Sequence, residues 1–161
     1  MSNAVEQECC PSFEPEISKW DDKIIEWDNK LFVKDKVFTI FYIPMNFSGV
    51  MTRIMQKFSD AKIESPEYLC LSEHTSLWNM DLLVATDKEL PNAQNVKLSG
   101  KFYSKVYEGE FKDMKKWMED FTLLSKAKGY NIKRIFNFYT TCPKCAKKYG
   151  KNYVVVLGKI D

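Results

Sequence analysis

The sequence predicts an α+β fold in which two β-α-β-β halves, near residues 37–85 and 98–160, form one antiparallel sheet with two helices on one face. Three observations predict it. Aromatic and β-branched runs alternate with stretches of helical spacing, the same order of segments occurs twice, and a polar linker at 86–97 separates the two occurrences. A central groove between the helices, with the sheet as its floor, is where we expect a ligand to bind.

The chain before the first half, residues 1–35, is acidic and aromatic. We expect it to form an N-terminal strap that packs its tryptophans on the domain of residues 36–161. Its apolar residues between Trp20 and Trp27 fit either a short helical turn or an extended arm.

The first half opens with KVFTIFYIP (36–44), an aromatic and β-branched run closed by Pro44, which predicts a strand. SGVMTRIMQKFSDAK follows, and its apolar residues recur at helical spacing after Ser48, which can cap a helix. YLCLS (68–72) and LWNMDLLVA (77–85) then predict two strands.

The second half repeats this order. LSGKFYSKVYEG (98–109) alternates like a strand, and EFKDMKKWMEDFTLLSKAKG places its apolar residues on one helical stripe before Gly129, a residue typical of helix ends. KRIFNFYTT (133–141) and NYVVVLGKI (152–160) predict the last two strands.

Composition limits the classes of partner. The 161 residues suit one domain, the net charge is only +2, and Arg53 and Arg134 are the only arginines, so the lysines mixed with acids indicate a solvated surface rather than a nucleic-acid interface. No apolar run is long enough to span a membrane and no signal segment begins the chain, so we expect a cytoplasmic protein with no membrane partner. We expect a monomer or weak homodimer.

The Cys142-Pro143-Lys144-Cys145 motif has three interpretations: half of a zinc site, a redox dithiol, or a structured connection between strands. A structural zinc needs a second pair of ligands, and the spacings of the other cysteines fit no common zinc pattern. The β-α-β-β order is not that of thioredoxin. The pattern favours a strand connection with small apolar cysteines, and we expect no metal and no cofactor.

A family resemblance is carried by HTSLWNMDLLVATDKELPNAQNV (74–96), LSGKFYSKVYEGEFKDMKKW (98–117) and YTTCPKCAKKYGKNYVVV (139–156). These stretches resemble the GyrI-like small-molecule-binding family, in particular its stand-alone, hydrolase-like branch. The resemblance implies a concave, aromatic-lined pocket for planar aromatic or cationic xenobiotics. Other members are sensor halves of transcription regulators, but this chain has no helix-turn-helix segment to spare. Family sensors often carry a glutamate near the start of the last strand, where this chain reads Gly150-Lys151-Asn152-Tyr153.

Aromatic residues are the candidate ligand-binding groups. Tyrosine and tryptophan combine a stacking surface with a polar tip, and the chain has more of them than a plain core of this size needs. The alternative, which the pattern favours for any single one of them, is a place in the core. The candidates are Tyr68, Trp78, Tyr103, Trp117, Phe138, Tyr139 and Tyr153.

Two carboxylates are the candidate catalytic groups. Asp81 interrupts the apolar strand WNMDLLV, so it must be paired or shifted in pKa. Glu108 lies where the first strand of the second half meets its helix, although an acid there also suits a helix start. His74, the only histidine, follows Glu73 in a probable turn and is the alternative base.

The resemblance and these candidates together predict a small-molecule-binding protein. Its activity would be hydrolysis of hydrophobic compounds, cyclopropane-bearing alkylating ones among them, held in an aromatic cage. The alternative is a non-catalytic protein that sequesters such compounds.

Overall fold

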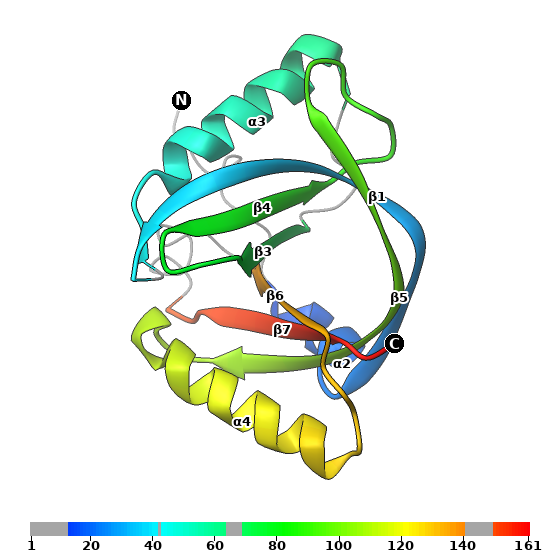
Figure 1. The fold of residues 1–161 in the computed structure, drawn as a ribbon, viewed down its shortest axis with the longest axis vertical. Helices are drawn as coiled ribbons and strands as arrows, with labels where there is room; N and C mark the ends of the chain where they lie inside the picture. The colour runs from blue at the N-terminus through cyan, green and yellow to red at the C-terminus, as the bar shows by residue number, and fades with distance from the viewer. Residues whose placement is uncertain (1–12, 42, 64–68, 141–149) are drawn as a thin grey trace.

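The computed structural model describes residues 13–41, 43–63, 69–140 and 150–161, which form an antiparallel sheet and three helices (Figure 1). The strands are β1 (Lys23–Ile40), β2 (Ile43–Pro44), β3 (Cys70–His74), β4 (Asn79–Ala85), β5 (Gln94–Glu108), β6 (Arg134–Tyr139) and β7 (Tyr153–Lys159). The helices are α2 (Ile17–Trp20), α3 (Phe47–Ala61) and α4 (Met114–Ala127), with short 3-10 turns η1 (Glu14–Glu16) and η2 (Phe111–Asp113).

The sheet closes on itself. Its strand order is β2-β1-β4-β3-β6-β7-β5, and β1 also pairs with β5, so every strand except the short β2 belongs to a closed antiparallel barrel. The length of β1 permits closure, because it pairs with β4 over 32–38 and with β5 over 23–34. The predicted α+β class and antiparallel sheet are confirmed, and the closure into a barrel is a feature that the prediction does not contain.

Two strands begin earlier than the sequence predicts. β1 begins at Lys23, within the predicted strap, and β5 begins at Gln94, within the predicted linker. The register of β1 shifts between Trp27 and Lys30, and Asn29 has a left-handed φ of 52°. Such a bulge interrupts the period-two alternation, which is why the sequence pattern does not reveal one continuous strand.

The inner face of the barrel carries the largest apolar cluster. Its buried members include Phe32, Leu71, Leu83, Phe102, Phe136, Phe138, Tyr153 and Leu157. Trp20 of α2 packs edge-on against Phe138 with ring centroids 5.4 Å apart, and Phe13 packs on the same ring at 5.8 Å. The N-terminal segment therefore covers one end of this core; α2 lies behind β7 in Figure 1.

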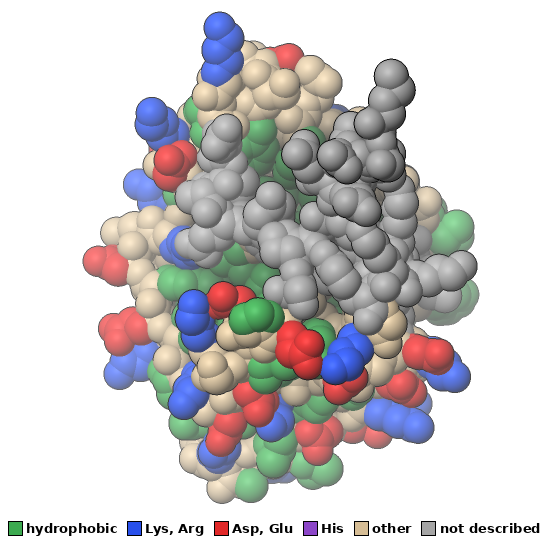
Figure 2. Space-filling model, turned by 180° about the vertical axis from the view of Figure 1, so that it is seen from behind, with side chains coloured by type: hydrophobic (Ala, Val, Ile, Leu, Met, Phe, Trp, Pro, Cys, Tyr) green, Lys and Arg blue, Asp and Glu red, His purple; other side chains and the backbone are tan. Residues whose placement is uncertain are grey.

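The two longer helices pack on the outer face of the barrel. α3 buries Val50, Ile54 and Phe58 against a cluster that includes Met80 and Leu82 of β4. α4 packs on a separate outer cluster that includes Phe121, Tyr103 and Val156. Figure 1 shows α3 and α4 on opposite sides of the barrel. Seen from behind, Figure 2 shows Lys and Arg side chains interspersed with Asp and Glu on the lower part of the molecule. Within the described ranges, no helix is long and apolar enough to cross a membrane.

Candidate functional site

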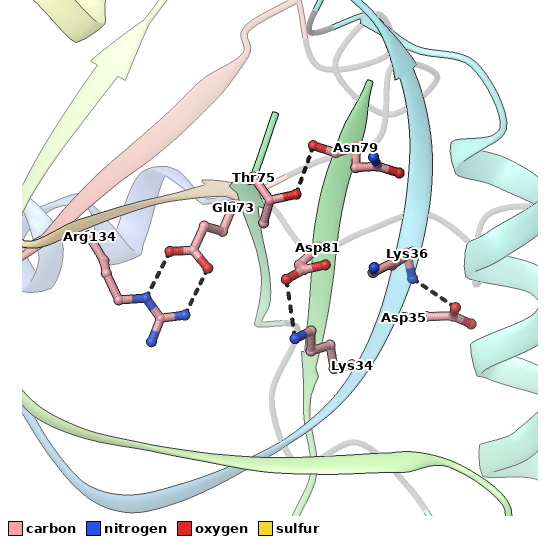
Figure 3. Close-up of polar contacts among 8 residues, drawn as sticks. All are labelled: Lys34, Asp35, Lys36, Glu73, Thr75, Asn79, Asp81 and Arg134. Atoms are coloured by element: carbon pink, nitrogen blue, oxygen red, sulfur yellow. Dashed lines mark hydrogen bonds and ion pairs between the residues drawn. The ribbon is translucent and has the colours of Figure 1, made fainter. Parts of the chain in front are cut away.

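The inner face of the barrel changes from apolar to charged toward one end of β4 and β1. Asp81 lies two residues before Leu83 of the inner core, so both side chains face the interior. By the same alternation, the two lysines that follow Phe32 in β1 face inward. We call this region the charged mouth, and it comprises Lys34, Lys36, Glu73, Asp81 and Arg134 (Figure 3).

Asp81 is the most deeply placed carboxylate of the charged mouth. Its side chain is 8% exposed, and its Oδ2 lies 3.2 Å from Nζ of Lys34, whose side chain is 27% exposed. Its other oxygen, Oδ1, is buried and has no hydrogen-bond partner among the described residues. A buried carboxylate oxygen without a partner is unfavourable, so a water molecule or a ligand that donates a hydrogen bond there would be stabilised.

Glu73 lies directly opposite Asp81 in the antiparallel pairing of β3 with β4. Two like charges at such positions repel, and Arg134 of β6 offsets this repulsion. Arg134 donates from Nε to Glu73 Oε2 at 2.8 Å and from Nη2 to Oε1 at 2.7 Å. The hydrogen bonds with Glu73 raise the pKa of Arg134, burial opposes the rise, and the charge of Asp81 adds to it. The charge of Asp81 therefore acts on the Glu73–Arg134 pair as well as on Lys34.

A continuous series of aromatic rings lies beside the charged mouth. Trp27 contacts Phe102 with centroids 4.9 Å apart and Phe32 at 5.8 Å, and Phe102 contacts Phe136 at 6.1 Å. The guanidinium carbon of Arg134 lies 4.8 Å from the centroid of Phe136, which joins the rings to the charged groups. We call these four rings, Trp27, Phe32, Phe102 and Phe136, the aromatic floor.

This arrangement has a definite chemical capacity. Trp27 is partly exposed and can hold a planar molecule by stacking and by burying apolar surface, whereas Phe32, Phe102 and Phe136 are 0% exposed and support its ring from within the core. The unpartnered oxygen of Asp81 can accept a proton from water. The neighbouring lysines can stabilise negative charge that develops on a bound molecule.

Two of the predicted ligand-binding residues lie on the α4 side of the barrel. Tyr103 is on the opposite face of β5 from Phe102, stacks on Phe121 at 5.4 Å, and donates from its hydroxyl to Asp22 at 2.8 Å. Burial and this hydrogen bond raise the pKa of Tyr103. Trp117 of α4 stacks on Tyr107 at 5.9 Å. The structure brings Tyr103 and Trp117 to the same outer side, away from the aromatic floor.

The other predicted aromatics are dispersed. Phe138 and Tyr153 lie in the inner core at the end covered by the N-terminal segment, where both contact the ring of Phe13. Tyr139 follows Phe138 and so faces outward, and burial raises its pKa. Trp78 is 47% exposed and contacts Phe41 at 5.5 Å. The position predicted at Tyr68 lies outside the described residues.

The two catalytic candidates are not brought together. Asp81 lies opposite Glu73, whereas Glu108 is exposed at the end of β5 and lies opposite Tyr153. His74 ends β3, is half-buried, and has a pKa lowered by burial. Of these groups, Asp81 alone lies in the charged mouth.

Several residues of the site were not singled out from the sequence: the aromatic floor, Lys34, Lys36, Glu73 and Arg134. One usable signal existed. Glu73 and Asp81 are equally distant from Leu77, so a hairpin between the two predicted strands would place them side by side. In the described part of the chain, no group of three or more potential metal ligands occurs, and Cys142 and Cys145 lie outside that part.

Comparison with known proteins gives a family and a fold. A family model described as "Bacterial hydrolase" matches residues 1–160. Among solved structures, the chain is similar to SAV2435 bound to tetraphenylphosphonium, with 14% sequence identity, a TM-score of 0.52, and coverage of 86% of this chain and 93% of that chain. At this identity the likeness concerns the fold alone. No curated protein matches the chain.

Proposed function

The chain belongs to the bacterial hydrolase family, and we propose that it binds planar aromatic small molecules in the charged mouth and hydrolyses them with Asp81 as the general base. The observation that carries this proposal is the Oδ1 atom of Asp81. It is buried without a hydrogen-bond partner in the described residues, while Lys34 holds the other oxygen of the same carboxylate. A proton acceptor is thereby held in place at the charged end of the inner face.

The proposed step is water addition. Oδ1 of Asp81 accepts a proton from a water molecule while the water oxygen bonds to an electrophilic carbon of the substrate, such as an ester carbonyl or an activated cyclopropane carbon. The bond from that carbon to its leaving group breaks, and the leaving group keeps the electron pair and later takes the proton from Asp81. A positioned general base contributes a factor of about 10²–10⁴ in rate.

Glu108 is the weaker candidate for the base. It is exposed at the end of β5, and an exposed carboxylate neither is held in one orientation nor excludes bulk water from a bound molecule.

Sequestration without turnover is the second candidate function. The likeness to a protein solved with tetraphenylphosphonium, a cation, supports it. In this case the aromatic floor would hold the compound, and the ion pairs of the charged mouth would only keep the barrel end in shape. Substrate conversion separates this function from hydrolysis.

We also propose that the halves near 37–85 and 98–160 arose by duplication. In support, β1 pairs with β4 and β4 with β3, while β5 pairs with β7 and β7 with β6 in the same relative order. A groove between α3 and α4 stays the alternative ligand location. Its floor would include Asn137, whose Oδ1 is buried without a hydrogen-bond partner among the described residues.

The test compares three carboxamide variants for turnover of aromatic esters and of a cyclopropane-bearing compound. Asp81→Asn keeps the shape and removes the base, so kcat/KM should fall by about 10²-fold or more. Asp35→Asn is the matched control, because Asp35 is also ion-paired on a neighbouring strand but faces Arg53 of α3 outside the barrel. Its kcat/KM should stay at the wild-type value, and so should that of Glu108→Gln. Unchanged turnover in Asp81→Asn would contradict the proposal.

A further inference from the structure

We infer that the charged mouth selects anionic aromatic molecules over cationic ones, with Lys36 as the residue that determines this preference. The inference rests on the proposed function for the location of the binding site, but it does not depend on turnover. The sequence predicts planar or cationic ligands, whereas the charges on the inner face favour the opposite sign.

The first step is a charge count over the inward-facing groups. Asp81 is neutralised by Lys34 at 3.2 Å, and Glu73 by the two hydrogen bonds from Arg134. At the neighbouring position of β7, Lys159 is neutralised by the Asp161 carboxylate at 3.2 Å. Within the described ranges, each of these three carboxylates thus has a cationic partner and is not left free to attract a cationic ligand.

The second step concerns Lys36. It lies directly opposite Asp81 in the pairing of β1 with β4, so its side chain is on the inner face. Figure 3 shows it on the Asp81 side of β1, while Asp35 lies on the side of α3. Lys36 makes no ion pair within the part of the chain that the structure describes. Among the described residues of the charged mouth, Lys36 is therefore a positive charge that no carboxylate offsets.

The third step joins this charge to the unpartnered oxygen. Oδ1 of Asp81 calls for a hydrogen-bond donor, and Lys36 calls for an anion, so a water molecule at Oδ1 and an oxyanion at Lys36 would satisfy both groups. In a hydrolysis, the oxyanion is the negative charge that develops on the carbonyl oxygen or on the leaving group. The substrate class that fits is a neutral aromatic ester whose products are an aromatic carboxylate or a phenolate.

The test measures binding of three probes that share one ring system: 2-naphthoate, 2-naphthamide and 2-naphthylmethylammonium. Calorimetry at low salt gives their dissociation constants. We expect the carboxylate to bind on the order of tenfold more tightly than the neutral amide, and the ammonium to bind more weakly than the amide. The preference should shrink at about 0.5 M salt because screening weakens the charge term.

Variants identify the responsible group. Lys36→Met should abolish the preference for naphthoate and leave naphthamide binding unchanged. Lys57→Met removes the same charge from α3, on the outer side beside Asp35, and should keep the preference. Asp81→Asn removes a negative charge from the mouth, so it should tighten naphthoate binding even though it lowers turnover.

The outcomes are distinct. Tighter binding of the ammonium probe than of the carboxylate overturns the inference, and so does a preference that survives Lys36→Met. A protein that converts no ester but keeps the Lys36-dependent preference supports the inference and refutes the hydrolase proposal. Loss of ester turnover in Asp81→Asn together with equal binding of all three probes supports the hydrolase proposal and refutes the inference.

Discussion

Replacing Asp81 should lower the proposed ester turnover by about 10²-fold or more without loss of stability. At 3.2 Å and an effective dielectric constant of about 20, Lys34 attracts Asp81 by about 5 kcal/mol. Opposing this are a desolvation cost of several kcal/mol for the buried carboxylate and repulsion from Glu73 across the strands; the unpartnered Oδ1 persists in asparagine and does not enter the difference. The opposing terms nearly cancel. Asp81→Asn should therefore change the free energy of unfolding by less than about 1 kcal/mol.

Asp81→Leu should stabilise the fold by about 1–3 kcal/mol, because a buried leucine adds apolar contact with the inner core and Lys34 is exposed enough to reach water. Urea unfolding followed by tryptophan fluorescence measures both variants. Asp35→Leu is the control. It removes a two-point hydrogen-bonded pair with Arg53 that ties β1 to α3, and should cost about 1 kcal/mol. A loss of more than about 2 kcal/mol in both Asp81 variants would show that Asp81 serves the fold and would refute the reasoning.

Three further predictions follow from packing and burial. Gly158→Ala would place a Cβ 2.7 Å from Ile132 and 2.9 Å from Phe121, so it should lower the free energy of unfolding by about 1–3 kcal/mol in urea titrations; an unchanged value would mean that α4 shifts freely. Burial raises the pKa of the Cys70 thiol to about 12, so a variant that keeps Cys70 alone should react with a thiol reagent at pH 8 only after unfolding, and rapid native reaction would contradict its burial. Burial lowers the pKa of His74, so the neutral imidazole is favoured in the folded state. The stability that the neutral His74 contributes should be present above pH 6.5, the ordinary pKa of histidine, and should be lost as pH falls below that value. Unfolding of wild type and His74→Gln between pH 7.5 and pH 5 should therefore converge, and parallel curves would exclude this contribution.

The elements of the fold were predictable where one periodicity runs without interruption. α3 spans Phe47–Ala61 and β6 spans Arg134–Tyr139, close to the helix and strand predicted there. The start of β1 was missed because the bulge at Asn29 breaks the alternation. The closure of the sheet depends on pairing between β1 and β5, which are far apart in sequence, and local patterns carry no information about such partners.

The site was predictable only in part. Asp81 is recognisable because a charge within an apolar strand needs a special environment. The rings of the aromatic floor were not, because β5 and β6 are buried on both faces around Phe102 and Phe136 and their sequences do not show which face is inside. The same ambiguity applies to Phe102 and Tyr103, which are adjacent and both buried, yet only Phe102 faces the interior.

A crystal structure of the complex with 2-naphthoate tests the central claim most directly. We predict that the naphthalene ring stacks on Trp27, the one ring of the aromatic floor that is not fully buried. Its carboxylate should accept a hydrogen bond from Nζ of Lys36 at about 2.7–3.2 Å, with a water molecule on Oδ1 of Asp81. A naphthoate bound instead on the outer face between α3 and α4, over Asn137, would contradict the account.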